Sequence, residues 1–406
     1  MSFSIALSGI NAASADLGVT GNNIANANTS GFKSSRAEFG DVFGATAYGL
    51  ARTTSGQGTR LQQIAQQFKQ GNLNYTDNTL DLAIQGEGFF TLKSDQGLAY
   101  SRAGAFGPDR QGFVVNSSNQ RLQVYPPLAS GQGFDTANLQ DLQLSNADSP
   151  PQATGLLQAK ANLPANATVP TTTPFNPSDP TSFNHTSSVT VYDSLGGTHN
   201  ATMYFVKNAT TNGWDLNTTI DGTSTGPATP LTFSSSGALL TPAGGKVTLP
   251  AVTLANGAAP LNITLGLGDT TQYGDAFSVS RLTQDGFTSG RLAGLEVTAE
   301  GVVQGRYSNG QAIALGQVAL ASFSNPQGLK KLGDTAFAES FSSGAPLRGQ
   351  AGSANLGAIQ SGALESSNVD LTAQLVNMIT AQRNFQANAQ MIQTSDQITQ
   401  TIINIR

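Results

Sequence analysis

Few side chains in this sequence are of the types that carry acid–base, nucleophilic or metal chemistry. There are two histidines, His185 and His199, and no cysteine. The lack of cysteine excludes disulfides, thiolate zinc sites and thiol catalysis. Both histidines fall in a region of β-type pattern, so we interpret them as solvated loop residues rather than as metal ligands or catalytic bases.

Carboxylates are the remaining candidates for chemistry. Two of them could act as a pair in glycoside hydrolysis, but no aromatic platform flanks them, and we interpret them as surface and turn residues. The motif Gly86-Glu87-Gly88 lacks the third glycine and the following helix of a dinucleotide-binding loop, and it indicates a turn or bulge. We therefore predict no enzymatic activity, no catalytic or metal-binding residue and no cofactor. The carboxylates considered are Asp193, Asp215, Asp269, Asp275, Glu296 and Glu300.

Composition narrows the class of protein further. The chain has 406 residues, of which only 11% are charged, and its formal net charge is −5. No run of Lys or Arg is present, which argues against nucleic-acid binding. No stretch approaches the ~20 apolar residues of a membrane span, and the N-terminus lacks the basic start and apolar core of a signal peptide. These features alone predict a cytoplasmic protein, and a surface so poor in charge suits packing against copies of itself.

The C-terminal segment predicts one long helix. Neither Gly nor Pro occurs between Val369 and Arg406, a length that would extend about 57 Å as a helix. Apolar residues recur there at steps of three and four around the polar Gln382, which is the spacing of a heptad seam. Plausible N-cap residues are Ser366, Ser367, Asn368 and Asp370. The seam consists of Leu371, Leu375, Met378, Phe385, Ala389 and Ile392, and then drifts to Ile398, Ile402 and Ile405.

The N-terminal segment has a matching pattern over about 25 residues. Asn26, Asn28, Ser30 and Gly31 should end this helix. Two narrow apolar stripes could belong to ordinary core helices, or the two ends could pair as a coiled coil whose other faces contact neighbouring subunits. The spacing leaves both possibilities open. The N-terminal stripe consists of Phe3, Leu7, Ile10, Leu17 and Ile24.

The middle of the chain predicts a β-rich region between the two helices. Residues 188–192 and 201–206 alternate apolar and polar side chains around a turn at Gly196-Gly197, which indicates a hairpin. Asn309-Gly310 lies between two strand-like runs, where a type I′ turn is expected. The proline-rich residues 162–184 indicate an extended crossing into a separate outer domain. The predicted fold is mainly β, with the terminal helices paired as a coiled coil and nested β-domains inserted between them.

Five segments resemble the family of bacterial flagellar rod, hook and hook-associated proteins. Residues 22–33 (NNIANANTSGFK) are similar to the family's N-terminal signature, and residues 367–371 and 378–388 to its C-terminal helix. Residues 85–90 (QGEGFF) and 100–106 (YSRAGAF) resemble its middle domain. The insertion between the two arms of the middle domain contains residues 183–196, which resemble the segment that begins the outer domain of hook proteins. Distal rod proteins are shorter because they lack such an insertion. A distal rod or hook-associated junction protein remains the alternative within the family, and an adhesin or an enzyme outside it.

The resemblance implies a layered subunit that polymerises into a curved, flexible tube and transmits torque. It implies an inner helical region (residues 1–70 and 355–406), a middle β-domain (71–145 and 285–354) and an outer β-domain (146–284). It also implies a location in the extracellular hook after export without a cleaved signal peptide. The implied partners are further copies of the chain, the hook-cap, distal rod and hook–filament junction proteins and the type III export apparatus. The expected assembly interface consists of Leu7, Ile10, Leu17, Ile24, Leu371, Leu375, Met378, Phe385 and Ile392.

Overall fold

The computed structural model describes residues 2–42, 56–128, 133–144, 148–353 and 355–404. It is mainly β, with one long helix at each end, α1 (Ser2–Ala25) and α2 (Leu371–Asn404). The chain forms two compact units, and unit 2 is inserted into unit 1. The predicted fold class is confirmed. Unit 1 comprises Met1–Ser145, Gly294–Arg306 and Ala312–Arg406, and unit 2 comprises Asn146–Ala293 and Tyr307–Gln311.

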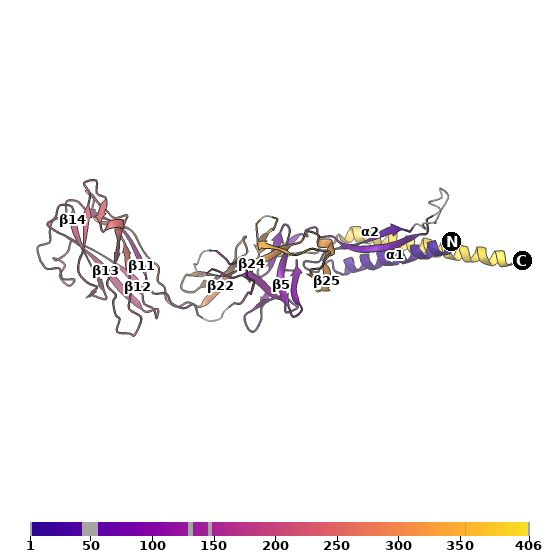
Figure 1. Cartoon of the computed structure of the whole chain (residues 1–406), viewed down its shortest axis with the longest axis horizontal. Coiled ribbons are helices and arrows are strands. Elements are labelled where there is room, and N and C mark those ends of the chain that lie inside the picture. Colours follow the sequence, from indigo (N-terminus) through magenta and orange to yellow (C-terminus); the bar gives the residue numbers. More distant parts are fainter. Residues whose placement is uncertain (1, 43–55, 129–132, 145–147, 354, 405–406) are drawn as a thin grey trace. The chain divides into compact units, whose positions relative to one another are not determined.

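In unit 1 the two terminal helices lie side by side and run antiparallel (Figure 1). Asn23 near the end of α1 donates a hydrogen bond to Gln374 near the start of α2, at 3.2 Å. α1 ends just before the Asn- and Gly-rich segment, as predicted. Asp370 caps α2, since its Oδ1 accepts hydrogen bonds from the backbone N–H groups of Thr372 and Ala373, at 2.9 and 3.1 Å. The predicted extension of α2 through residues 405 and 406 lies outside the described residues.

Short sheets join the first part of unit 1 to its last part. β1 (Ser35–Asp41) and β2 (Thr59–Gln66) form an antiparallel pair that contacts α1. β3 (Leu73–Tyr75) pairs with β29 (Ala363–Glu365). Similarly, β4 (Leu82–Gln85) pairs with β28 (Ala358–Ser361). The β3–β29 and β4–β28 pairings hold the segment that follows α1 against the segment that precedes α2.

The remaining strands of unit 1 form a twelve-stranded sheet with the order β22-β23-β24-β9-β5-β6-β26-β25 along its main path. Its core is a cluster of buried aliphatic residues and two phenylalanines, centred on Leu92, Leu122 and Val318. The strands are β5 (Phe89–Ser94), β6 (Gly97–Ser101), β7 (Gly107–Pro108), β8 (Val114–Val115), β9 (Arg121–Tyr125), β10 (Gln140–Asp141), β22 (Leu292–Val297), β23 (Val302–Tyr307), β24 (Ala312–Ser322), β25 (Lys330–Gly333), β26 (Ala336–Ala338) and β27 (Leu347–Gln350).

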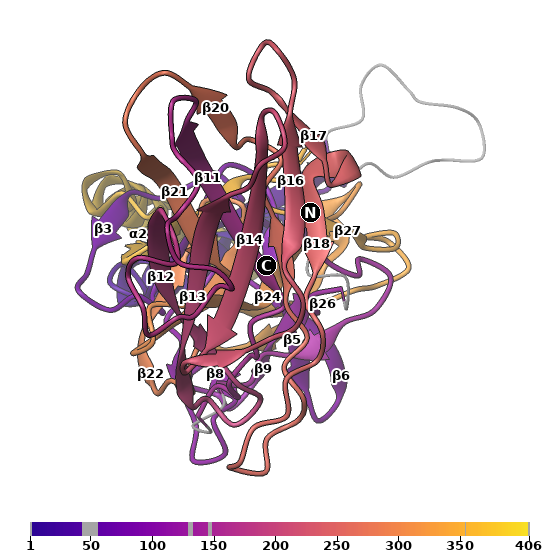
Figure 2. The same cartoon turned by 90° about the vertical axis from the view of Figure 1, so that its left-hand side faces the viewer.

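Unit 2 contains two sheets with one buried core between their apolar faces. The first has the order β12-β13-β14-β16-β17 (Figure 2), and the second β18-β19-β11-β20, with β21 beside β11. Trp214 and Phe205 are the largest side chains in this core. The strands are β11 (Leu156–Pro164), β12 (His185–Tyr192), β13 (Thr198–Lys207), β14 (Gly213–Ile220), β15 (Thr223–Ser224), β16 (Thr229–Phe233), β17 (Leu239–Thr241), β18 (Lys246–Thr248), β19 (Thr264–Gly266), β20 (Thr271–Tyr273) and β21 (Ser278–Gln284).

Two local predictions are corrected by the structure. The hairpin of β12 and β13 is confirmed, but the proline-rich residues 162–184 lie within unit 2 and do not lead into it, because β11 already belongs to its sheet. The turn at Asn309-Gly310 is not of type I′, since only Gly310 has a positive φ (81°). Tyr307 and Gln311 close a three-residue loop whose last residue is left-handed, the usual alternative for a hairpin of this length.

Candidate functional site

The paired terminal helices are the first part of the candidate site. Their contact is made by small and polar residues: Ala6, Ala13 and Ala381 are buried, and Gly9 faces Asn388 so closely that a Cβ on Gly9 would lie 2.3 Å from the amide oxygen. Asn23 is also buried; it accepts a hydrogen bond from the Ser35 N–H and donates one to the Ser35 carbonyl, both at 2.8 Å. α1 is therefore held to both α2 and the β1–β2 pair.

The predicted interface residues separate into two groups in the structure. Ile10, Leu17, Ile24, Met378 and Ile392 are half-buried within the subunit. Leu7 is exposed, and so are Leu371, Leu375 and Phe385, with relative exposures of 47%, 52% and 38% on α2. The buried and half-buried side chains of α2 from Gln374 to Ile392 are Gln374, Met378, Ala381, Asn388, Ala389 and Ile392. This covered face is displaced around the helix from the predicted seam, with which it shares Met378, Ala389 and Ile392.

Exposed apolar residues near the start of α2 form a second row. Val376 and Ile379 join Leu371 and Leu375 in it, and each is about half exposed. Further along the same helix, Met391, Ile398 and Ile403 are also exposed. A helix with apolar side chains on two faces needs a partner for each of them, because water-exposed apolar patches of this size usually mark interaction surfaces.

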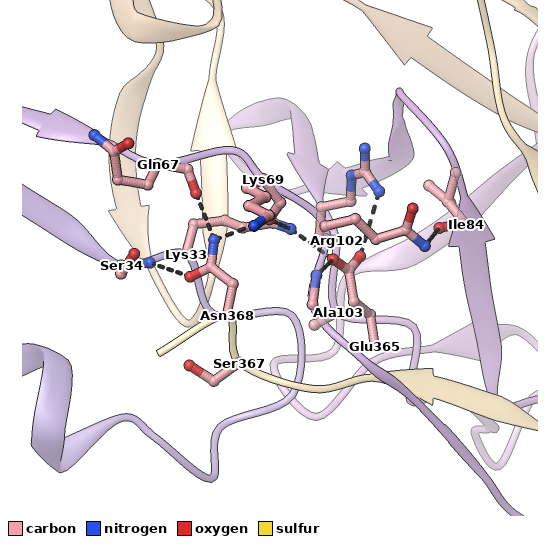
Figure 3. Close-up of polar contacts among 12 residues, drawn as sticks. Lys33, Ser34, Gln67, Lys69, Ile84, Arg102, Ala103, Glu365, Ser367 and Asn368 are labelled. Carbon is pink, nitrogen blue, oxygen red and sulfur yellow. Dashed lines mark hydrogen bonds and ion pairs between the residues drawn. The ribbon is translucent and has the colours of Figure 1, made fainter. Parts of the chain in front are cut away.

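A buried charge cluster is the second part of the candidate site (Figure 3). Lys33 Nζ lies 2.6 Å from Glu365 Oε1, and Arg102 Nη1 lies 3.3 Å from Glu365 Oε2. The side chains of Lys33 and Glu365 are fully buried, and that of Arg102 is 5% exposed. We call these three residues the charge cluster. The Glu365 carboxylate is the shared ion-pair partner of Lys33 and Arg102, and its single negative charge offsets only part of their two positive charges.

Backbone groups satisfy most of the remaining polar atoms of the charge cluster. Lys33 Nζ donates to the Lys69 carbonyl at 2.9 Å, and Arg102 Nη2 donates to the Gly86 carbonyl at 2.8 Å. Glu365 Oε1 accepts a hydrogen bond from the Gly71 N–H at 2.8 Å. Burial lowers the pKa of Lys33, and Glu365 raises it in opposition. Burial lowers the pKa of Arg102 as well, but a guanidinium keeps its proton.

Asn368 extends this network to the start of α2 (Figure 3). Its Oδ1 accepts a hydrogen bond from the Ser34 N–H at 2.8 Å, and its Nδ2 donates to the carbonyls of Gln67 and Lys69 at 2.7 and 2.8 Å. Together with the charge cluster, Asn368 ties the end of α1, the β2–β3 segment and the start of α2 together. Lys33, Arg102 and Asn368 all lie in the motifs that the sequence singled out. Sequence reasoning assigned no role to Lys33 or Arg102, interpreted Asn368 only as a possible N-cap residue, and missed Glu365 altogether.

The interpretation of the two histidines in unit 2 as solvated loop residues is wrong. His185 begins β12, and its ring stacks on Phe277 at a centroid distance of 4.4 Å. His199 lies in β13 with a side chain only 14% exposed; its Nδ1 lies 2.6 Å from Asp221 and its Nε2 3.1 Å from Asp193. Asp193, predicted to be a surface residue, has a fully buried side chain. Its role is structural, since it also accepts hydrogen bonds from the N–H groups of the following turn.

These contacts make the stability of unit 2 depend on pH. The hydrogen bond to Asp221 raises the pKa of His199, with Asp193 adding to the effect. A neutral imidazole can donate to only one of the two carboxylates. We expect the free energy of unfolding of unit 2 to be highest below the ordinary histidine pKa of ~6.5 and to fall, by on the order of 1 kcal/mol, as pH rises through the raised value. Urea titrations between pH 6 and pH 9, followed by Trp214 fluorescence, should show this fall.

The His199→Gln variant is the control for that pH dependence. It should be less stable than the unaltered chain at pH 6 and show little change up to pH 9. An unaltered slope in the variant would contradict the assignment to His199.

Below pH 4 the stability of unit 2 depends on Asp193 instead. Burial raises the pKa of Asp193, but hydrogen bonds from Asn256 and His199 outweigh this and lower it to about 2. Its stabilisation is lost as pH falls towards that value.

No group of three or more potential metal ligands occurs among the residues that the structure describes. In that part of the chain no helix combines the length and apolarity needed to cross a membrane. The candidate site consists of the packing surfaces of the terminal helices and the buried charge cluster.

Comparison with protein-family models defines the class of protein. Residues 3–33 match the flagella basal body rod protein model, and residues 83–173 match the flagellar hook protein FlgE/F/G D1 domain. Residues 162–287 match the flagellar basal body protein FlaE D2 domain, and residues 360–405 the flagellar basal body rod FlgEFG protein C-terminal model. These four matches place the chain in the class of flagellar rod and hook proteins.

Whole-chain relatives narrow the class to one family. The flagellar hook proteins of Salmonella typhimurium and Escherichia coli K12 are each 40% identical to this chain over the full length of both. That of Borreliella burgdorferi is 34% identical and covers 96% of the chain. The chain belongs to the flagellar hook proteins. It is accordingly a structural, polymerising component of the bacterial flagellar hook, not an enzyme, and the rod and junction alternatives are set aside.

A solved structure supports the fold alone. The Helicobacter pylori flagellar hook protein FlgE2 covers 72% of this chain with a TM-score of 0.54 and 14% sequence identity. All of that chain is matched.

Proposed function

We propose that this chain builds the hook by packing its two terminal helices against those of neighbouring subunits. In this proposal α1 and α2 line the inside of a curved, flexible tube that transmits torque from the rod to the filament. The observation that carries it is the exposed apolar row of α2, which includes Leu371 and Leu375, each about half exposed to water in the single subunit. Burying the exposed half of such side chains would contribute about 1 kcal/mol each.

The assembly interface in this proposal contains both groups of terminal-helix residues. Those already half-buried would position the helix pair, and the exposed ones would contact other subunits. A pair of helices with so few buried apolar residues is marginal by itself, since isolated helices gain most of their stability from packing. Polymerisation would therefore stabilise the same helices that drive it. The residues are Leu7, Ile10, Leu17, Ile24, Leu371, Leu375, Met378, Phe385 and Ile392.

We further propose the three-part division of the subunit into inner (1–70 and 355–406), middle (71–145 and 285–354) and outer (146–284) regions. The outer region has its own core in unit 2, separate from the core in the large sheet of unit 1, which supports its division from the middle region. In this division the charge cluster is the junction between the inner and middle regions, because Lys33 and Glu365 of the inner region meet Arg102 of the middle one. The buried ionic junction would transmit force between the inner and middle regions without slipping.

Bending requires contacts that can exchange, and the outer region has a suitable surface. It is rich in Thr, Ser, Asn and Gly and poor in long charged side chains. Hydrogen bonds between such groups contribute only about 0.5–1.5 kcal/mol each, because water replaces them readily. Neighbouring outer regions could therefore slide while the inner helices stay packed. The proposed further partners are the hook-cap, distal rod and hook–filament junction proteins and the type III export apparatus.

Electron microscopy of the purified chain tests this proposal. We expect short curved tubes after polymerisation, and a strain without the gene should be non-motile, with basal bodies that end at the rod. Straight rods, or a mutant strain that still makes hooks, would contradict the proposal.

A further inference from the structure

Three Asn-Gly pairs occur in the sequence, at Asn212-Gly213, Asn256-Gly257 and Asn309-Gly310. Such a pair can lose its side-chain amide spontaneously, because glycine has no Cβ to hinder attack of its backbone nitrogen on the asparagine carboxamide. The attack needs a nitrogen that is open to water and not already hydrogen-bonded. The reactivity of each pair therefore depends on what the fold does with its glycine nitrogen.

The fold occupies the glycine nitrogen in two of the three pairs. Gly213 is buried at the start of β14 and donates its N–H to the Thr210 carbonyl at 3.0 Å. Gly310 donates its N–H to the Tyr307 carbonyl, also at 3.0 Å. Each nitrogen must give up this hydrogen bond before it can attack, which slows the reaction about two- to tenfold.

The third pair, Asn256-Gly257, leaves its nitrogen open. Both residues are exposed in the loop between β18 and β19 of unit 2. Within the described part of the chain, no group accepts a hydrogen bond from the Gly257 N–H. A Cβ on Gly257 would meet no atom within 4 Å, so the space around this glycine is open. Among the three pairs, this one has the nitrogen best placed to react.

The Asn256 carboxamide reaches from this exposed loop to a buried carboxylate. Its Nδ2 donates to Asp193 Oδ2 at 2.5 Å, and the Asp193 side chain is fully buried. The other titratable groups around this contact are His199, 3.1 Å from Asp193, and Asp221 on the far side of the imidazole, at 2.6 Å. Conversion of the amide to an acid would replace a donor to Asp193 with a second carboxylate, and two carboxylates in contact disfavour each other's charge.

Hydrogen bonds to the carboxamide do not distinguish the exposed pair from Asn309-Gly310. Asn256 Oδ1 accepts from the Ala258 N–H at 3.1 Å, and Asn309 Oδ1 accepts from the Gln311 N–H at the same distance. Asn309 Nδ2 also donates to a backbone carbonyl, at 2.8 Å. The difference between these two pairs lies in the glycine nitrogen.

We propose that Asn256 is a site of spontaneous deamidation, and that the reaction disrupts the buried contact with Asp193. The Gly257 nitrogen forms a bond to Asn256 Cγ, the Cγ–Nδ2 bond breaks, and ammonia leaves with the proton of the N–H group. Water then opens the cyclic imide at either carbonyl, which gives aspartate or isoaspartate at position 256. The modification requires only the folded subunit and water.

Ageing of the folded full chain in warm, mildly alkaline buffer, followed by peptide mapping, tests the site. Aspartate and isoaspartate should accumulate at position 256 at least about twofold faster than at positions 212 and 309. The chain unfolded in urea is the control, because all three pairs should then react at similar rates. Equal or faster reaction at position 212 or 309 in the folded chain, or the same preference for position 256 in urea, would overturn the inference.

The Asn256→Asp variant, which reproduces one product, tests the effect on Asp193. One carboxyl of the new pair should take up a proton above the ordinary aspartate pKa of ~3.9. The stability of unit 2 in the variant should therefore be retained below that pH and fall as pH rises through the raised pKa. In urea titrations followed by Trp214 fluorescence, the midpoint should lie below that of the unaltered chain at pH 7, with a smaller difference at pH 4.

Asn262→Asp is the matched control for the added charge. Asn262 is exposed near the same loop, and its Nδ2 donates only to the Pro260 carbonyl, at 3.3 Å. This variant should keep the midpoint of the unaltered chain at both pH values. If Asn256→Asp lowered the midpoint at pH 7 no more than Asn262→Asp does, the proposed effect on Asp193 would be overturned.

Discussion

The Glu365→Gln variant should lower the free energy of unfolding of unit 1 by about 3–5 kcal/mol. The substitution keeps the shape of the side chain, removes its negative charge and replaces one acceptor oxygen with an NH₂ donor. Lys33 and Arg102 then remain buried, close to each other, with no carboxylate to balance them. Because both cations lose their partner at once, the loss of stability should exceed about 3 kcal/mol, the lower limit for breaking an ordinary buried ion pair.

The two units allow this effect to be located. The single tryptophan, Trp214, is buried in unit 2, so its fluorescence reports the unfolding of that unit. Circular dichroism at helical wavelengths reports α1 and α2 in unit 1. In urea titrations of Glu365→Gln, the helical transition should shift to lower denaturant while the fluorescence transition stays in place. A shift of both transitions by the same amount would contradict a local role for the charge cluster.

Glu38→Gln is the matched control for the buried charge. Glu38 makes an ion pair with Arg36 at 2.7 Å, but the Arg36 side chain is 67% exposed. Exposed pairs contribute at most about 1 kcal/mol, because water screens the charges. If Glu365→Gln destabilised unit 1 no more than Glu38→Gln does, the charge cluster would not be the junction that we describe.

The Leu375→Asp variant should abolish polymerisation while leaving the free subunit folded. Leu375 is half exposed in the subunit, so an aspartate there meets water and costs little. In the polymer the same position would be buried. Loss of about 1 kcal/mol of further apolar burial, together with the larger cost of placing an unpaired charge there, should raise the critical concentration at least about a hundredfold. Sedimentation after polymerisation measures this change directly.

Asn377→Asp introduces the same charge two residues away on another face of α2. Asn377 is exposed and polar, so this variant should polymerise at a concentration close to that of the unaltered chain. Equal loss of polymerisation in both variants would show that added charge, and not the apolar row, decides the outcome. Normal polymerisation of Leu375→Asp would remove Leu375 from the proposed interface.

The sequence predicted the two terminal helices well because their signals are local. For α2, the apolar repeat, the lack of Gly and Pro and the Asp370 cap can all be recognised within one segment; for α1, the apolar repeat and the Asn- and Gly-rich stop can be. The register between the helices could not be predicted in this way. The contact depends on Gly9 opposite Asn388 and on Asn23 beside Gln374, which are small or polar residues without an apolar signal. The predicted seam on α2 was therefore displaced from the face that meets α1.

The charge cluster was inaccessible to sequence reasoning for a different reason. Lys33 and Glu365 are 332 positions apart, and no local pattern marks a lone Lys or Glu as buried. The best available signal was that Lys33, Arg102 and Asn368 each lie in a motif characteristic of the family. The histidines of unit 2 were misassigned because an alternating pattern places a residue in a strand but does not show which charged partners the neighbouring strand provides.

Electron cryomicroscopy of tubes assembled from the full chain tests the central claim most directly, which is that the terminal helices join the subunits. We predict that α1 and α2 are the innermost elements of the wall, with Leu371 and Leu375 buried against the helices of other subunits. Tubes in which these helices lie on the outside, or in which the apolar row of α2 remains exposed to solvent, would contradict the account.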